Sequence, residues 1–105
     1  MSTLKEVTVG LVVRIVAKPG KEETVASFLA GAESLARAEE FTPAWFALRT
    51  EPRVFYVVDA FADEEDRTKH LLGEIAKALF ANADELLSEA PRIEKASVLG
   101  AKLPG

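Results

Sequence analysis

The sequence has 105 residues, the length of one domain, with no cysteine and a single histidine, His70. This composition excludes disulfide frameworks, thiol nucleophiles, Cys-ligated metal sites and any site that needs two imidazoles. Seventeen acidic residues against thirteen basic ones give a net charge of −4, the wrong sign for binding phosphate backbones, so we expect no nucleic-acid partner. The start, MSTLKEV, has no signal-peptide pattern and no apolar run approaches the ~20 residues of a membrane span, so we expect a cytoplasmic protein that does not contact a membrane.

Two segments make up the first part of the chain. Residues Val7–Ala17 are rich in β-branched side chains that alternate with a period of two, which predicts a strand. Both faces of this strand are largely apolar, so we expect cover on both sides of the sheet. After a Lys-Pro-Gly turn, apolar residues recur every three or four positions, which predicts one helix over residues 21–39.

The second part of the chain contains three strands and further helix. Strands are predicted over Ala44–Glu51 and Val54–Phe61, and the two residues between them are a hairpin-length loop. An acidic run from Asp63 then begins a helical region in which Gly73 is a candidate break. A last strand is predicted over Ile93–Lys102.

This βαββαβ order predicts a ferredoxin-like α+β fold, with a four-stranded antiparallel sheet and the helices on one of its faces. We expect one domain, residues 1–105, with a core that covers residues 7–102. The uncovered face of the sheet would carry the second apolar side of the first strand. A second copy of the chain is the simplest cover for it, so we predict a homodimer that joins through the sheet faces.

Two titratable residues are the candidates for chemistry. Asp59 lies in the apolar segment FYVVDAF, so it is either an acid/base group or the orienter of an imidazole, or else a structural partner of Arg49, Arg14 or a loop amide. His70 is the one side chain that titrates near neutral pH when unperturbed, which makes it the first candidate for proton transfer. If the helix runs through Gly73, His70 lies on a solvated face; if the helix breaks there, His70 can point back to the sheet.

Aromatic and basic residues in the strands are candidate ligand contacts. Trp45 and Tyr56, the only Trp and the only Tyr, either stack on an aromatic ligand or belong to the core or an interface. Arg14 and Arg49 either hold an anionic or phenolate group or pair with strand carboxylates such as Glu51. The six glycines form no phosphate-binding loop, and we expect neither a cofactor nor a bound metal.

The stretch DAFADEEDRTKH, from the third strand into the second helical region, resembles the antibiotic biosynthesis monooxygenase family of small dimeric α/β barrel proteins, which includes quinol monooxygenases. Family members often carry an acidic residue late in this strand, an aromatic residue two positions later, an acidic turn residue and a His eleven positions after the first acid. Here these are Asp59, Phe61, Asp63 and His70. AWFALRTEP and the segment from HLLGEIAK to GAKLP are also similar to small bacterial members, so the resemblance covers most of the chain.

The resemblance implies a cytoplasmic homodimer, a dimeric α/β barrel, with a pocket between sheet and helices in each subunit. In such monooxygenases an electron-rich quinol or polyphenol, once deprotonated, reacts with oxygen without metal, flavin or haem. His70 would accept the phenolic proton and Asp59 would orient the imidazole. The expected substrate contacts are Trp45, Arg49, Phe61 and Tyr56.

Departures from the family pattern bear on this chemistry. Asp59 replaces a more usual Glu, and Ile75 stands where many members have a second His. The first strand lacks the Asn, and the later segment the Trp, of haem-degrading relatives, so we expect no haem. Three functions therefore compete: a cofactor-independent monooxygenase acting on a quinol or polycyclic phenol, a non-catalytic dimer that binds a small aromatic ligand or a protein partner, and an isomerase or decarboxylase that uses one His–Asp pair.

Overall fold

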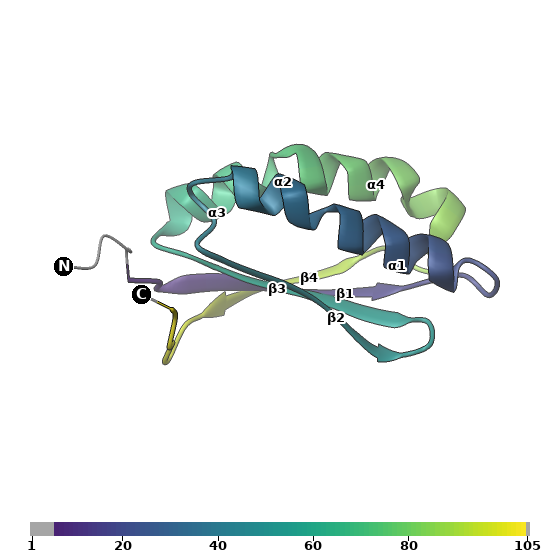
Figure 1. The fold of residues 1–105 in the computed structure, drawn as a ribbon, viewed down its shortest axis with the longest axis horizontal. Coiled ribbons are helices and arrows are strands. Elements are labelled where there is room, and N and C mark those ends of the chain that lie inside the picture. Colours follow the sequence, from purple (N-terminus) through teal and green to yellow (C-terminus); the bar gives the residue numbers. More distant parts are fainter. Residues whose placement is uncertain (1–5, 105) are drawn as a thin grey trace.

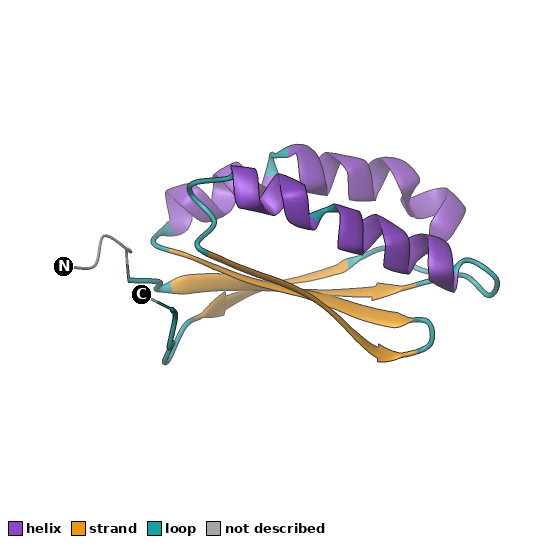
Figure 2. Cartoon of the chain, viewed as in Figure 1, coloured by secondary structure: helices purple, strands orange, loops and turns teal. Residues whose placement is uncertain are grey.

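The computed structural model describes residues 6–104. They form one sheet with helices over one of its two faces (Figures 1 and 2). The elements are β1 (Val9–Val16), α1 (Glu22–Gly31), α2 (Glu33–Ala38), β2 (Ala44–Glu51), β3 (Val54–Phe61), α3 (Glu64–Leu71), α4 (Glu74–Leu86) and β4 (Arg92–Ser97). The strand order is β2-β3-β1-β4, with every neighbouring pair antiparallel. This confirms the predicted ferredoxin-like α+β fold. None of the helices in the described part of the chain is long and apolar enough to cross a membrane.

Both helical regions are divided in two. The predicted helix over residues 21–39 is α1 followed by α2, joined at Ala32, whose backbone stays right-handed helical (φ −69°, ψ −14°). The candidate break at Gly73 is confirmed, because α3 ends at Leu71 and α4 begins at Glu74. The side chain of Asp63 caps α3 by accepting a hydrogen bond from the Asp66 amide at 2.9 Å. This cap fixes where α3 starts and hence which way its last turn faces.

The core lies between the helices and the face of the sheet beneath them. It is built from alternate residues of the two central strands, among them Leu11, Val13, Ile15, Phe55, Val57 and Phe61, together with residues of the covering helices, among them Val25 and Leu29. The α3 helix packs closely on β1 and β3, whereas α4 stands further from the sheet. The space left under α4 is where the candidate site lies.

The opposite face of the sheet has no helix over it (Figure 1). Phe46 and Leu48 of β2 lie on this face with 56% and 47% of their surface exposed. The last strand is shorter than predicted: β4 ends at Ser97 because its β1 partner, Val9, is the first residue of that strand. The tail, residues 98–104, leaves the sheet and lines an open hollow of about 290 Å³ against its open face.

Candidate functional site

Asp59 occupies the centre of the site. It lies on the helix-covered side of β3, opposite Leu11 of β1 and Trp45 of β2, and its side chain has no exposed surface. The backbone here is unusually close to β1, since a Cβ on Gly10 would lie 2.7 Å from the Asp59 carbonyl oxygen. Only glycine permits this approach.

His70 faces the sheet, with 6% of its side chain exposed. The interior orientation, which depended on a helix break at Gly73, is therefore the observed one. The ring packs against Phe61 with centroids 5.2 Å apart and planes tilted by 43°. Arg67, one turn earlier in α3, donates hydrogen bonds to the carbonyls of Gly10 (3.1 Å) and Ala96 (3.2 Å), which ties the helix to β1 and to the end of β4.

A carboxylate lies at each ring nitrogen of His70. Nδ1 is 2.7 Å from Glu39 Oε1 in a hydrogen bond, and Nε2 is 3.0 Å from Asp59 Oδ2, off the axis of a straight hydrogen bond. Thr42 Oγ1 also donates to Glu39 Oε1, at 2.8 Å. Among residues 6–104, no group donates to Asp59 Oδ1. The cluster thus holds one imidazole between two carboxylates and leaves one buried carboxylate oxygen unengaged.

Burial and charge act in opposite directions on this cluster. Burial of the imidazole disfavours its charged form, but the neighbouring Asp59 and Glu39 carboxylates outweigh this and raise the pKa of His70 above its ordinary 6.5. Burial raises the pKa of Asp59 above its ordinary 3.8, although the contact with His70 opposes the shift. Asp59 is therefore a stronger base than an exposed aspartate, which suits a group that must take a proton near neutral pH.

Asp59 and His70 line a cavity of about 40 Å³ between the sheet and α4. All its other lining residues are apolar, and they come from β1, β3, β4, α1, α3 and α4. Phe80 and Ile93 line it and are also 50% and 37% exposed, so the cavity reaches the surface between α4 and β4. At ~10–15 Å³ per water molecule, this volume holds a few waters but not an aromatic ring.

The four predicted substrate contacts are not in this cavity. Phe61 is fully buried behind His70, and Tyr56 is half-buried on the opposite face of the sheet. Arg49 lies near the hairpin end of β2, where it pairs with Glu23 at 2.8 Å and stacks over Phe55. The predicted pairing of Arg49 with a strand carboxylate is therefore wrong, because Glu23 belongs to α1.

The structure also differs from the ion pairs predicted for Arg14 and Asp59. Arg14 pairs with Glu89 at 2.8 Å, and not with a strand carboxylate. Asp59 has neither arginine as its partner. Glu39 is the site residue that the sequence did not reveal: it follows α2, 31 positions before His70, and nothing local marks so distant a contact.

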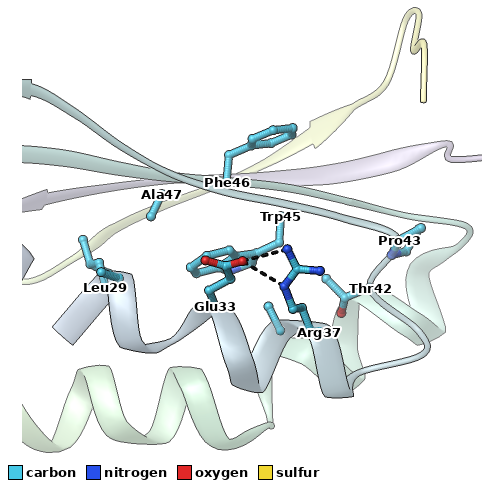
Figure 3. Close-up of a pocket in the computed structure, with 10 residues that line it drawn as sticks. Leu29, Glu33, Arg37, Thr42, Pro43, Trp45, Phe46 and Ala47 are labelled. Atoms are coloured by element: carbon cyan, nitrogen blue, oxygen red, sulfur yellow. Dashed lines mark hydrogen bonds and ion pairs between the residues drawn. The ribbon is translucent and has the colours of Figure 1, made fainter. Parts of the chain in front are cut away.

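Trp45, the fourth predicted contact, lines a separate and larger hollow (Figure 3). This is a groove of about 660 Å³ between β2 and the helices α1 and α2. Trp45 points toward the helices while Phe46 points to the other side of the sheet, and Glu33 and Arg37 form an ion pair beside the indole. Both ionic side chains are more than half exposed. No group of side chains suited to a metal ion occurs in residues 6–104.

The chain is similar to several proteins of known structure. It is 56% identical to the NE2512 protein of unknown function from Nitrosomonas europaea, over 94% of this chain and 96% of that one, with a TM-score of 0.92. The chain therefore belongs to the same family as that protein. No family model matches the sequence, and no curated protein does.

The chain shares its fold with proteins provisionally assigned as antibiotic biosynthesis monooxygenases. One from Nitrosomonas europaea is 14% identical, with a TM-score of 0.79 over 88% of this chain and 99% of that one. Another, from Caulobacter crescentus, is 19% identical, with a TM-score of 0.77 over 90% and 92% of the two chains. The predicted resemblance to the antibiotic biosynthesis monooxygenases is confirmed at the level of the fold.

Proposed function

We propose that the protein is a cofactor-independent monooxygenase that oxidises a quinol or a polycyclic phenol with molecular oxygen. The observation that carries this proposal is the buried Asp59–His70 pair in an otherwise apolar cavity. Buried titratable pairs with shifted pKa values in apolar hollows are typical of sites that move protons. The shared fold of the provisionally assigned monooxygenases adds support.

In this proposal Asp59 accepts the proton, and His70 acts with it as a pair. Both nitrogens of His70 already face carboxylates, so neither is free to meet a substrate hydroxyl. Asp59 Oδ1 has a free lone pair and belongs to a residue that lines the cavity. A phenolic hydroxyl placed against Oδ1 transfers its proton there, and the neighbouring imidazolium stabilises the carboxylate beforehand.

The phenolate then reacts with oxygen without help from a bound group. It gives an electron to O₂, and the resulting radicals combine at a ring carbon as a peroxide anion. This anion takes back the proton held by Asp59, and loss of water from the hydroperoxide leaves a carbonyl. For a phenol with a free para position, one oxygen atom enters the ring to give a quinone and the other leaves as water. The apolar walls favour the neutral ring and dissolved oxygen over water.

The cavity must widen to admit a ring. The side that can yield is the one under α4, because Phe80 is half exposed and α4 stands off the sheet. The opposite side is fixed, since Arg67 ties α3 to two strands. Substrate entry by movement of the Phe80 side chain leaves the Asp59–His70 pair in place.

Oxygen uptake with a panel of hydroquinones and naphthols tests the proposal. Asp59→Asn keeps the shape of the side chain but removes the base, so we expect the rate to fall about 10²–10⁴-fold, the usual contribution of a general base. Asp84→Asn, an exposed residue of α4, is the matched control and should retain the native rate. Uptake that is equal in Asp59→Asn and native protein would remove Asp59 from the mechanism.

A non-catalytic ligand-binding protein is the second candidate, favoured by the groove of about 660 Å³ beside Trp45, which has the volume for an aromatic ring. It predicts that phenols raise the melting temperature as expected for binding to the native state alone, with no oxygen consumed and no product formed. An isomerase or decarboxylase would convert its substrate equally well without oxygen. Anaerobic incubation followed by product analysis separates these cases.

We also propose that a second copy of the chain covers the open face of the sheet. This face bears large apolar side chains such as Phe46 and Leu48, about half exposed in the single chain. Two copies of one apolar face match each other about a two-fold axis, with no other partner needed. Sedimentation at micromolar concentration should show a dimer, and Phe46→Glu should convert it to a monomer; a native monomer would contradict the proposal.

A further inference from the structure

Glu39 is the one member of the buried cluster that does not line the cavity. It makes the shortest contact with the imidazole, 2.7 Å from Nδ1, and retains a little exposure, 12% of its side chain. Its carboxylate therefore acts on the far side of His70 from Asp59. Any effect it has on a ligand must pass through the ring.

We propose that Glu39 is a positioning residue that keeps the shared proton of the buried pair on His70, so that Asp59 presents a free carboxylate to the cavity. The catalytic consequence rests on the proposed function; the location of the proton does not.

The charge balance of the cluster is the first argument. A buried Asp59–His70 pair has no net charge whether the proton is on the imidazole or on the carboxylate, and burial favours the arrangement with no separated charges. In that arrangement Asp59 is protonated and useless as a base. A second carboxylate 2.7 Å from Nδ1 attracts the proton to the ring, because Asp59 meets the ring at its other nitrogen, Nε2.

The way in which Glu39 is held is the second argument. The Thr42 hydroxyl donates to the same oxygen that meets Nδ1. Space for the carboxylate comes from Gly73, since a Cβ there would lie 3.0 Å from Glu39 Oε2. Thr42 itself is buried, so this hydrogen bond is shielded from water. Thr42 and Gly73 thus help to fix one carboxylate against the ring.

The other elements packed around His70 supply no competing charge. The cavity residues of β1, α1, α4 and β4 are apolar. On α3 itself, the half-exposed Lys69 lies 3.7 Å from the buried Asp66. The buried guanidinium of Arg67 is turned to the main-chain carbonyls of Gly10 and Ala96. Among residues 6–104, the charged groups that shift the pKa of His70 are those of Asp59 and Glu39.

Nitrogen-15 NMR of the side chain of His70 tests the proposal directly, since the protein has a single histidine. Long-range ¹H–¹⁵N spectra of ligand-free protein at pH 7 should show both ring nitrogens protonated. In Glu39→Gln, we expect the midpoint of the His70 titration to fall by about one pH unit or more. Glu40→Gln, which removes the same charge from an exposed neighbour, should leave the midpoint unchanged.

Thr42→Val provides a second variant in case Glu39→Gln folds poorly. It preserves volume, removes the hydroxyl that holds Glu39, and should lower the midpoint by a smaller amount. A neutral His70 in the native protein at pH 7, or a Glu39→Gln midpoint equal to that of Glu40→Gln, would overturn the proposal. If the NMR results are as expected but no phenol is oxidised, the proton location stands and the proposed function falls.

The same variant has a kinetic signature once a substrate is found. Glu39→Gln should lower kcat and shift its pH profile while leaving KM close to native, since Glu39 touches no ligand. A role confined to stability would change neither the His70 spectrum nor the pH profile.

Discussion

The two hollows on the helical side of the molecule differ in nearly every respect. The groove beside Trp45 is about 660 Å³, open, and bordered by an exposed ion pair, whereas the cavity at Asp59 is about 40 Å³ and contains buried charges. An exposed ion pair contributes little free energy and imposes little geometry. A buried carboxylate is costly to hold, so its presence in the small cavity is the stronger sign of a site.

The largest effect should come from Phe61, which packs behind His70 at the small cavity. This ring has no exposed surface and supports His70, so Phe61→Ala should lower the free energy of unfolding by about 3–5 kcal/mol. Phe80→Ala, at a half-exposed ring, is the matched control and should lower it by less than about 1.5 kcal/mol. Urea denaturation measures both. Equal losses in the two variants would mean that the packing behind His70 is not tight.

An intermediate effect should appear in the dependence of stability on pH. Because the folded state raises the pKa of His70, it binds more protons than the unfolded state above pH 6.5. The free energy of unfolding should therefore be largest on the acid side of this window and decrease as pH rises through the folded pKa. The slope cannot exceed about 1.4 kcal/mol per pH unit, the value for one proton.

Denaturation curves from pH 6 to pH 9 measure this slope. Glu39→Gln should flatten the decrease, while a change of the exposed groove pair, Arg37→Ala, should leave its shape as in the native protein. Stability that rises with pH across this range would show that His70 is neutral in the fold.

The smallest effects concern ligand binding. Phe80→Ala should widen the small cavity and increase the melting-temperature shift produced by phenols several-fold. Arg37→Ala should change stability by no more than about 0.5 kcal/mol and leave that shift unchanged. If Arg37→Ala abolishes the phenol-induced shift and Phe80→Ala does not alter it, the ligand site is the groove.

Local patterns predicted the fold better than the site. The strands Ala44–Glu51 and Val54–Phe61 were predicted with the observed bounds, because alternation and a two-residue loop define a hairpin without reference to the rest of the chain. The division of the helix over residues 21–39 was missed. Ala32 remains helical, so the apolar stripe stays in phase on either side of the break and periodicity does not reveal it.

Identifying all the residues of the site required knowledge of contacts between distant segments. Asp59 and His70 stood out by residue type, since one is a carboxylate in an apolar strand and the other is the lone imidazole. Glu39 is one of many glutamates, and only the fold shows that it meets Nδ1. Arg49 pairs with Glu23, 26 positions away. The partner of an exposed charge depends on which side chains the fold brings close, and neighbours in the strand do not predict it.

The attachment of α3 by Arg67 has a consequence for what evolution can change in this fold. The guanidinium joins the helix that carries His70 to main-chain carbonyls of two strands, so its hold does not depend on which side chains those strands bear. Substitutions in the cavity walls under α4 can then accumulate without displacing the imidazole. The shape of the cavity can thus change while Asp59 and His70 remain where they are.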